Sequence, residues 1–183
     1  MKMPWFVAFL SMVGIACSPT TYTNGVPNLA QVDQTKNIWR SGQPATLESW
    51  KYIKSLGVKS VVKLNFDEEG NDEGAMAMGI DVLYVPIEPK GDVVSVVKGP
   101  DPANIARAVQ ALMRPDTLVH CTHGEDRTGA VVGALRVVGY GWKKSRAWQE
   151  MLAHHFHPEL PALMLWWLDF DGQWPSGQVS PEP

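Results

Sequence analysis

A short loop between an apolar run and a helix-compatible segment carries the residues with the clearest chemistry. Residues 116–129 are Asp-Thr-Leu-Val-His-Cys-Thr-His-Gly-Glu-Asp-Arg-Thr-Gly, with Cys121 directly after the apolar run and Arg127 near the end of the loop. Residues 117–120 predict a buried strand, and residues 128–139, rich in Ala, Val, Leu and Gly, predict a helix. A loop from a strand into a helix aims backbone N–H groups and the helix dipole at an anion. The sequence therefore predicts a phosphate-binding loop with a nucleophile at its base.

The side chains of this loop suit phosphoryl transfer. A thiol at a helix N-terminus beside a cation ionises more readily than a free thiol, so we expect Cys121 to be a thiolate at neutral pH. Arg127 can hold two phosphate oxygens with its planar guanidinium, whose charge matches that of the transferring group. Thr128 is placed where its hydroxyl could hydrogen-bond the sulfur and ease its departure.

The positions between the nucleophile and the arginine are expected to line the substrate. They are Thr122, His123, Gly124 and Glu125. Gly124 permits a backbone conformation or a close approach that a side chain would obstruct. For His123, contact with substrate and contact with solvent alone are both left open. Glu125 and Asp126 add negative charge, which repels highly charged substrates.

The sequence His120-Cys121, five residues, Arg127-Thr128 resembles the signature of the cysteine-dependent protein tyrosine and dual-specificity phosphatases. Residues 38–44 and 56–64 are similar, more weakly, to segments of small bacterial members, so the resemblance spans about residues 30–170. It implies an α/β domain of tyrosine-phosphatase type, with a central, largely parallel sheet flanked by helices. It also implies a metal-independent phosphomonoester hydrolase that works through a cysteinyl-phosphate intermediate and needs no cofactor.

The same resemblance suggests supporting roles for two residues outside the loop's centre. His120 would order the loop through hydrogen bonds rather than take a proton from the substrate. Arg40 would brace the loop from below, although a simple surface ion pair is an equal alternative.

A phosphomonoester needs a carboxylic acid that protonates its leaving oxygen. Asp92 is the first candidate, because it lies in a Gly-containing loop after the predicted strand ending at Ile87 and its spacing from Cys121 is similar to that in dual-specificity phosphatases. Its alternative is a solvated loop residue. Asp126 is the rival, because some family branches carry Asp-Arg-Thr at this point, but it could instead cap the following helix.

Three histidines near the C-terminus raise the question of a metal site. His154, His155 and His157 cluster in the sequence, but no Cys or clear carboxylate set joins them at ligand spacing. We therefore expect surface or helix-end histidines and no metal.

Three functions other than hydrolysis of phosphoproteins are alternatives for this loop. Inositol phosphates or phosphoinositides could be hydrolysed by the same mechanism. A non-catalytic phosphate-binding module would not need the nucleophile that Cys121 provides. A sulfurtransferase also places a Cys above a helix, but the His before it and the Arg-Thr after it suit phosphate better.

The length of the chain predicts one domain, and its N-terminal segment predicts export. The chain has 183 residues, a formal net charge of −3 and two Cys, which argues against nucleic acid as a partner. Residues 1–16 predict a signal peptide ending in a bacterial lipobox, so that Cys17 would carry a lipid anchor in the periplasm or cell envelope. We expect a tether at 17–29, the phosphatase domain at 30–171 and a flexible tail at 172–183. The expected partners are a phosphorylated protein or small molecule, and a membrane through the anchor.

Hydrophobic periodicity predicts strands that alternate with helices, as in a largely parallel sheet. Leu47, Trp50 and Ile53 would face inward on the first helix, and Asp101 would cap a later one. Expected helices are 46–56, 71–78, 102–113, 143–155 and 160–170, and expected strands are 58–64, 80–87 and 117–120.

Overall fold

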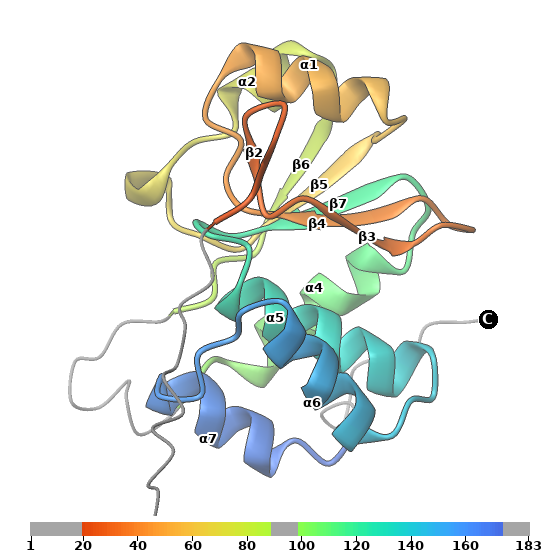
Figure 1. The fold of residues 1–183 in the computed structure, drawn as a ribbon, viewed down its shortest axis with the longest axis vertical. Coiled ribbons are helices and arrows are strands. Elements are labelled where there is room, and N and C mark those ends of the chain that lie inside the picture. Colours follow the sequence, from red (N-terminus) through yellow and green to blue (C-terminus); the bar gives the residue numbers. More distant parts are fainter. Residues whose placement is uncertain (1–19, 89–98, 174–183) are drawn as a thin grey trace, which may run out of the picture.

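The computed structural model describes residues 20–88 and 99–173. A five-stranded sheet in the order β3-β4-β7-β5-β6 divides this part of the chain into two layers of helices (Figure 1). All its pairs are parallel except β3 with β4. The strands are β3 Ala30–Asp33, β4 Ile38–Ser41, β5 Ser60–Lys63, β6 Asp81–Tyr84 and β7 Thr117–His120. The expected α/β architecture with a largely parallel central sheet is confirmed.

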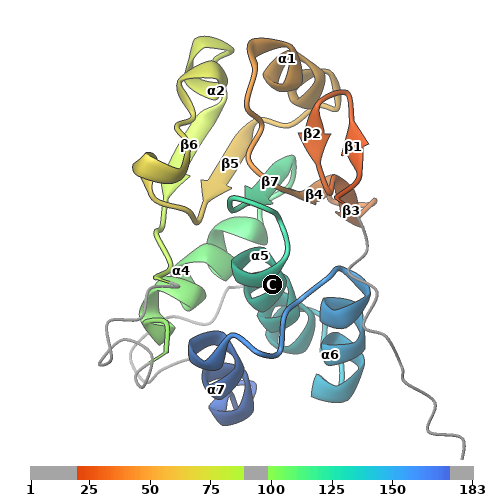
Figure 2. The ribbon, with the colours of Figure 1, turned by 60° about the vertical axis from the view of Figure 1, so that its left-hand side comes forward.

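Helices cover both faces of the sheet, and each layer has its own apolar core (Figures 1 and 2). The smaller layer holds α1 Leu47–Ser55 and α2 Glu73–Ala77. The larger layer holds α4 Pro102–Leu112, α5 Asp126–Ala134, α6 Lys144–Ala153 and α7 Pro161–Asp169. Two short helical turns, η1 Asp67–Glu69 and η2 Leu135–Gly139, follow β5 and α5. Because β7 and α5 are both buried, the loop between them has a rigid base.

The helix α1 shows how local sequence sets an element. The hydroxyl of Thr46 accepts a hydrogen bond from the Ser49 amide at 3.1 Å and caps the helix. Gly57 follows its last turn with φ +84°, a conformation that glycine adopts without strain. Trp50 and Ile53 are buried as expected. The inward orientation expected for Leu47 is wrong, because this residue of the first turn is 47% exposed.

The larger layer confirms the predicted helix cap at Asp101 and has a well-buried apolar core. Asp101 caps α4 by accepting a hydrogen bond from the Ala103 amide at 2.9 Å. Ile105, Val109 and Leu112 of α4 are buried, as are Trp166 and Trp167 of α7, whose rings contact each other. Leu152 of α6, in contrast, is 42% exposed.

Residues 20–29 are ordered, which corrects the expectation of a tether over 17–29. Their two short strands, β1 Tyr22–Thr23 and β2 Val26–Pro27, form an antiparallel hairpin. Val26 is fully buried, and the side-chain amide of Asn28 donates a hydrogen bond to the carbonyl of His123, in the loop between β7 and α5, at 3.0 Å. The hairpin is therefore part of the domain and supports the site.

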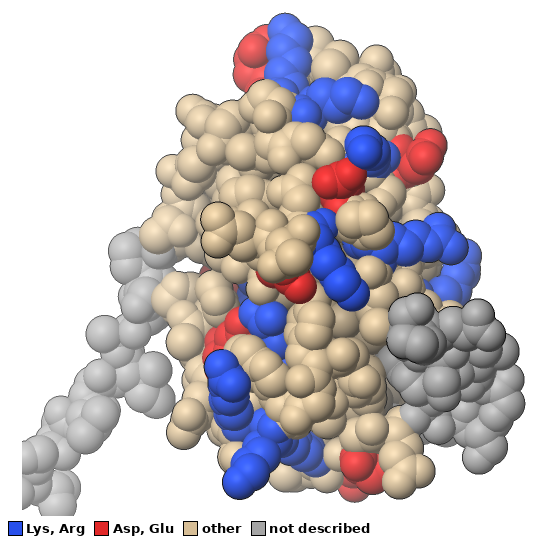
Figure 3. Space-filling model, turned by 90° about the vertical axis from the view of Figure 1, so that its right-hand side faces the viewer, with Lys and Arg blue, Asp and Glu red and all other residues tan. Residues whose placement is uncertain are grey.

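Charges are intermingled on the face where the parallel strands begin. Figure 3 shows this face with Lys and Arg set among Asp, Glu and neutral residues. Lys59 and Asp116, which precede β5 and β7, form one such ion pair at 2.8 Å. Pairs of this kind on a surface are worth at most about 1 kcal/mol.

Four predictions fall wholly or largely outside the described residues: the signal peptide, the lipid anchor at Cys17, the position of Asp92 and the tail at 172–183, of which only 172–173 are described. Among the helices of 20–88 and 99–173, none has the length and apolarity needed to cross a bilayer.

Two substitutions on α1 compare how much a buried and an exposed apolar side chain contribute to stability. Ile53→Ala should lower the free energy of unfolding by about 2–5 kcal/mol, because it leaves a cavity in a fully buried site. Leu47→Ala, on the same helix but half exposed, should change it by no more than about 0.5 kcal/mol. Urea denaturation of both variants measures the difference, and equal losses would contradict the packing of this layer.

Candidate active site

The loop between β7 and α5 surrounds the sulfur of Cys121. Cys121 follows the last residue of β7, is 3% exposed, and its Sγ accepts a hydrogen bond from the Gly124 amide at 3.3 Å. The N-terminus of α5 begins at Asp126, so the helix dipole and the loop amides meet at this position. The structure thus brings the nucleophile and an anion-stabilising main chain together.

The end of β4 fixes the shape of this loop. Gly124 has φ +80°, and a Cβ there would lie 2.4 Å from the Gly42 nitrogen and from the Ser41 carbonyl carbon. The Gln43 amide also donates a hydrogen bond to the carbonyl of Thr122 at 3.0 Å. Both the positive φ and the close contact exclude a side chain at this position, which is the reason the loop needs glycine.

Arg40 lies beneath the loop. It is 2% exposed, and its Nη2 donates a hydrogen bond to the carbonyl of Gly124 at 2.8 Å. Burial lowers the pKa of Arg40 to about 10, while the negative charges of Glu150 and Cys121 oppose that shift. This contact is the one that a bracing role requires, and the alternative of a surface ion pair does not fit a buried side chain.

Glu69 holds Arg127 in place over the loop. Nη1 and Nη2 of Arg127 donate to the two carboxylate oxygens of Glu69, each at 2.8 Å, and Nη2 also donates to the hydroxyl of Thr122 at 2.9 Å. Thr122 in turn donates to Glu69 at 3.0 Å. The hydrogen bond from Arg127 is the main cause that lowers the pKa of Glu69 to about 2. Burial alone would lower the pKa of Arg127, but the hydrogen bond to Glu69 and the charge of Cys121 raise it.

His120 makes its hydrogen bond away from the loop. The ring is fully buried, and its Nε2 lies 2.9 Å from Oδ2 of Asp72, while Nδ1 has no hydrogen-bond partner among the described residues. The expectation that His120 orders the loop by direct hydrogen bonds therefore needs correction: its partner is a carboxylate that precedes α2. Asp72 is itself held by the side-chain amide of Gln43 at 2.8 Å.

The hydroxyl of Thr128 does not make the expected bond to the sulfur. Thr128 is fully buried in the first turn of α5, and its Oγ1 has no hydrogen-bond partner among the described residues. In this structure only the Gly124 amide contacts the sulfur by a hydrogen bond among the described groups.

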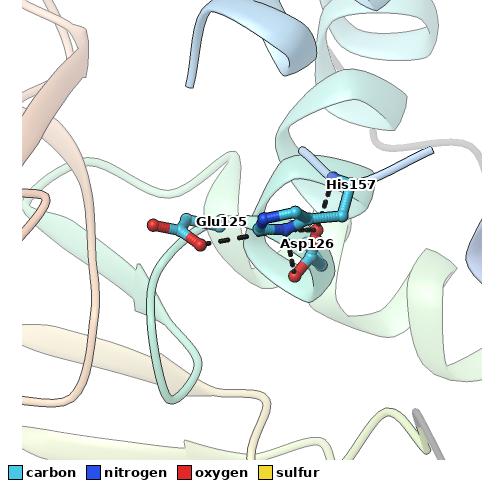
Figure 4. A group of neighbouring side chains, drawn as sticks. All are labelled: Glu125, Asp126 and His157. Carbon is cyan, nitrogen blue, oxygen red and sulfur yellow. Dashed lines mark hydrogen bonds and ion pairs between the residues drawn. The ribbon is translucent and has the colours of Figure 1, made fainter. Parts of the chain in front are cut away.

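Asp126 points toward His157 (Figure 4). Its Oδ1 accepts a hydrogen bond from the backbone amide of His157 at 2.8 Å and lies 3.0 Å from the ring nitrogen Nδ1. These bonds favour the charged form of His157 and raise its pKa, against the effect of burial. Asp126 therefore does not cap the helix that it begins, as was expected; its carboxylate binds the backbone amide of His157 instead.

Glu125 lies beside Asp126 and His157, a proximity that was not predicted from the sequence. Its carboxylate lies 3.9 Å from Nδ1 of His157 and accepts a hydrogen bond from the Asn28 amide at 2.9 Å. The expectation that no carboxylates accompany His157 is therefore wrong, because the fold brings two of them from a distant segment. Each of these side chains already has a hydrogen-bond or ion-pair partner within the protein. Of the neighbouring histidines, His154 ends α6 as expected, and burial lowers its pKa to about 4.

Two carboxylates of the site were missed by the sequence interpretation. Glu69 and Asp72 both lie in the segment that follows β5, which is the neighbour of β7 in the parallel sheet. The carboxyl ends of parallel strands meet at one edge of a sheet, where ligands bind in open α/β folds. The acidic run after residue 64, placed at that edge, was the signal that could have identified them. His123, in contrast, is exposed, and the structure leaves both of its alternatives open.

A buried cysteine in the loop between a strand and a helix, together with an arginine held by Glu69 and Thr122, defines a cysteine-based phosphate site on an α/β sheet. The profile of the Tyrosine phosphatase family matches residues 26–159. The chain therefore belongs to the tyrosine phosphatase family.

Individual relatives agree with this assignment. The chain is 36% identical over 117 residues to an inositol diphosphatase, DSP4, of Arabidopsis thaliana, an alignment that covers 61% of this chain and 56% of that protein. It is 29% identical over 134 residues to the dual specificity protein phosphatase TpbA of Pseudomonas aeruginosa, covering 73% of this chain and 58% of that protein. The chain thus spans a little over half the length of these curated relatives.

A solved structure shows the same fold. The crystal structure of P. aeruginosa TpbA superposes with a TM-score of 0.61 at 22% sequence identity, over 84% of this chain and 90% of that one. This similarity supports the tyrosine-phosphatase-like architecture predicted from the sequence.

The ion pair between Glu69 and Arg127 should make stability depend on pH in acid. The pKa of Glu69 lies near 2 in the folded protein against an ordinary value of 4.5, so its contribution is complete above 4.5 and is lost as the pH falls toward 2. Glu69→Gln should therefore be less stable than the wild type at neutral pH, and the difference should narrow in that acid range. Thermal unfolding as a function of pH measures this.

Glu68→Gln is the matched control for that measurement. Glu68 is the exposed neighbour of Glu69, so its replacement should leave the pH dependence of the wild type unchanged. A constant difference between Glu69→Gln and the wild type across the acid range would show that the ion pair does not stabilise the fold.

Proposed function

We propose that this protein is a metal-independent, cysteine-dependent phosphatase that hydrolyses phosphomonoesters. The observation that carries the proposal is the position of Cys121: the residue is buried, its sulfur accepts a hydrogen bond from the Gly124 amide, and it interacts electrostatically with Arg127. Membership of the tyrosine phosphatase family supports it. A non-catalytic phosphate-binding module would have no use for this nucleophile, and a sulfurtransferase would not need the arginine held by Glu69.

The mechanism follows from the geometry. The thiolate of Cys121 attacks phosphorus, forming the S–P bond as the P–O bond to the leaving group breaks and a carboxylic acid protonates the leaving oxygen. Loop amides and Arg127 hold the phosphoryl oxygens, and the Nε of Arg127 is not used by its bonds to Glu69 and Thr122. Water then attacks phosphorus, gives its proton to the same carboxylate, and the S–P bond breaks to release phosphate.

Removing the sulfur separates binding from chemistry. Cys121→Ser should reduce turnover of a phosphotyrosine peptide by a factor on the order of 10³ or more, because the hydroxyl is a far weaker nucleophile, yet still bind phosphate in calorimetry. Arg127→Lys should lose both turnover and phosphate binding, since an ammonium cannot make the paired contacts of a guanidinium. Unchanged turnover in Cys121→Ser would refute the mechanism.

Asp92 is the proposed leaving-group acid, in preference to Asp126. Asp126 is engaged with the backbone and ring of His157, so its carboxylate is already held by another part of the protein. Asp92 lies in the segment between β6 and α4, outside the described residues, and its role is carried over from the family resemblance.

The acid can be identified from the dependence of rate on pH. Asp92→Asn should lose the basic limb of the profile of kcat/KM, because that limb reports deprotonation of the acid in the free enzyme. The kcat/KM profile of Asp126→Asn should retain its basic limb. The reverse pattern would assign the acid to Asp126.

The substrate class is proposed to be a phosphorylated protein, with inositol phosphates as the second candidate. The name of the Arabidopsis relative favours the second. The first is supported by the name of the dual-specificity relative.

We further propose that the enzyme works in the cell envelope, anchored through lipid at Cys17. This proposal is supported only by the sequence of residues 1–17, with its basic start, apolar run and Cys.

A further inference from the structure

The side chain of Asn28 joins the N-terminal hairpin to the catalytic loop between β7 and α5, and the mechanism above gives it no role. Asn28 directly follows β2, and its Nδ2 donates two hydrogen bonds: one to the carbonyl of His123 at 3.0 Å and one to Oε1 of Glu125 at 2.9 Å. Both acceptors lie between Cys121 and Arg127. A residue 95 positions before His123 in the sequence therefore contacts the centre of the loop.

Hydrogen bonds within the hairpin fix the orientation of the Asn28 side chain. Its Oδ1 accepts from the backbone amide of Thr21 at 3.1 Å and from the Thr21 hydroxyl at 3.3 Å. Because an amide N–H only donates, the oxygen must face Thr21 and the Nδ2 group must face the loop. The backbone of Asn28 has φ +47°, a left-handed conformation that asparagine tolerates better than most residues. Both features suit asparagine at this position.

The hydrogen bond to His123 acts on the peptide group that faces the nucleophile. The carbonyl of His123 and the amide of Gly124 belong to one peptide group, and that amide donates to Sγ of Cys121 at 3.3 Å. The C=O and N–H of a planar trans peptide point in opposite directions, and none of the described peptide bonds is cis. A donor that holds this carbonyl therefore directs the N–H toward the sulfur. It also polarises the peptide group, which makes the N–H a stronger donor.

The two neighbouring peptide groups of the loop are held in the same way. The carbonyl of Thr122 accepts from the backbone amide of Gln43 at 3.0 Å, and that of Gly124 accepts from Nη2 of Arg40 at 2.8 Å. Three successive carbonyls are thus bonded by donors from outside the loop. Gln43 donates through its main chain and Arg40 through a charged group, whereas Asn28 uses a neutral side chain. The contact of Asn28 can therefore be removed without changing the net charge.

We propose that Asn28 is a positioning residue for catalysis: its side-chain amide fixes and polarises the peptide group whose N–H stabilises negative charge at Cys121. The proposal deepens the proposed function and rests on it only for the catalytic consequence, a lower barrier to phosphoryl transfer. The hydrogen bond of the Gly124 amide is a property of the protein whether or not a substrate is hydrolysed.

Two substitutions of Asn28 test this role in the kinetics of a phosphotyrosine peptide. Asn28→Gly keeps the left-handed backbone without strain but removes the donor, and it should lower kcat by about tenfold, the size of one hydrogen bond. Its KM should change by less than about twofold, because the contact acts in the transition state. Asn28→Asp keeps the shape of the side chain but presents an acceptor to the loop, so it should lose at least as much of kcat. Wild-type kcat in either variant overturns the proposal.

Asn24→Asp is the matched control for the kinetics. Asn24 lies in the turn of the same hairpin, is exposed and also has a positive φ, +48°. The described hydrogen bonds from the hairpin to the side chain of Glu125 and the carbonyl of His123 come from Asn28 instead. The kcat of Asn24→Asp should equal that of the wild type, and a loss as large as that of Asn28→Asp would overturn a specific role for Asn28.

NMR of the full chain labelled with ¹⁵N-glycine and ¹⁵N-asparagine tests the contact without substrate. In Asn28→Gly, the Gly124 amide should exchange with solvent at least about tenfold faster than in the wild type, while the glycine signals of α5 stay in place. An unchanged Gly124 amide overturns the proposal. In the wild type, both side-chain amide protons of Asn28 should be protected from exchange, and rapid exchange overturns the proposal even if the variants fail to fold. These NMR signatures in a wild-type protein that releases no phosphate would disprove the proposed function alone.

Discussion

The close contact between the catalytic loop and the end of β4 is the constraint on which the site depends. Gly124 adopts a positive φ and leaves no space for a Cβ against Ser41 and Gly42, and Arg40 donates to its carbonyl from beneath. This geometry turns the Gly124 amide toward the sulfur of Cys121. Preorganised donors of this kind cost no rearrangement during reaction, which is the reason they contribute strongly to catalysis.

Two arginines, Arg40 and Arg127, supply positive charge near the sulfur of Cys121. Arg40 is buried and donates to the carbonyl of Gly124 in the loop, and both Arg40 and Arg127 interact electrostatically with Cys121, so a thiolate or a bound phosphate would have two cations nearby. Burying a cation is costly unless a partner compensates it. Glu69 provides that compensation for Arg127, whereas Arg40 makes one described hydrogen bond and leaves Nε and Nη1 without partners among the described residues. A buried, incompletely paired arginine favours an anion nearby, which suits a site that must hold a thiolate and phosphate.

Local sequence predicted the parts of this site that depend on neighbours in the chain. The strand at 117–120, the loop, the following helix and the caps at Thr46 and Asp101 each follow from a few consecutive residues. The resemblance of residues 38–44 now has a physical explanation, because Arg40, Gly42 and Gln43 all contact the loop or its supports. The site partners Glu69, Asp72 and Asn28 were not predicted, because their contacts depend on sheet order and on a hairpin that has only two residues per strand. Leu47 was misplaced because an apolar residue in the first turn of a helix can lie beyond the edge of the core.

The central claim is that Cys121 itself carries the phosphoryl group during turnover. Acid quenching of the enzyme during hydrolysis of a phosphotyrosine peptide, followed by peptide mass spectrometry, tests this most directly. The account predicts one phosphoryl group on the peptide that contains Cys121, bonded through sulfur. A phosphoryl group on another residue, or hydrolysis with no phosphorylated enzyme under conditions that preserve phosphocysteine, would contradict it.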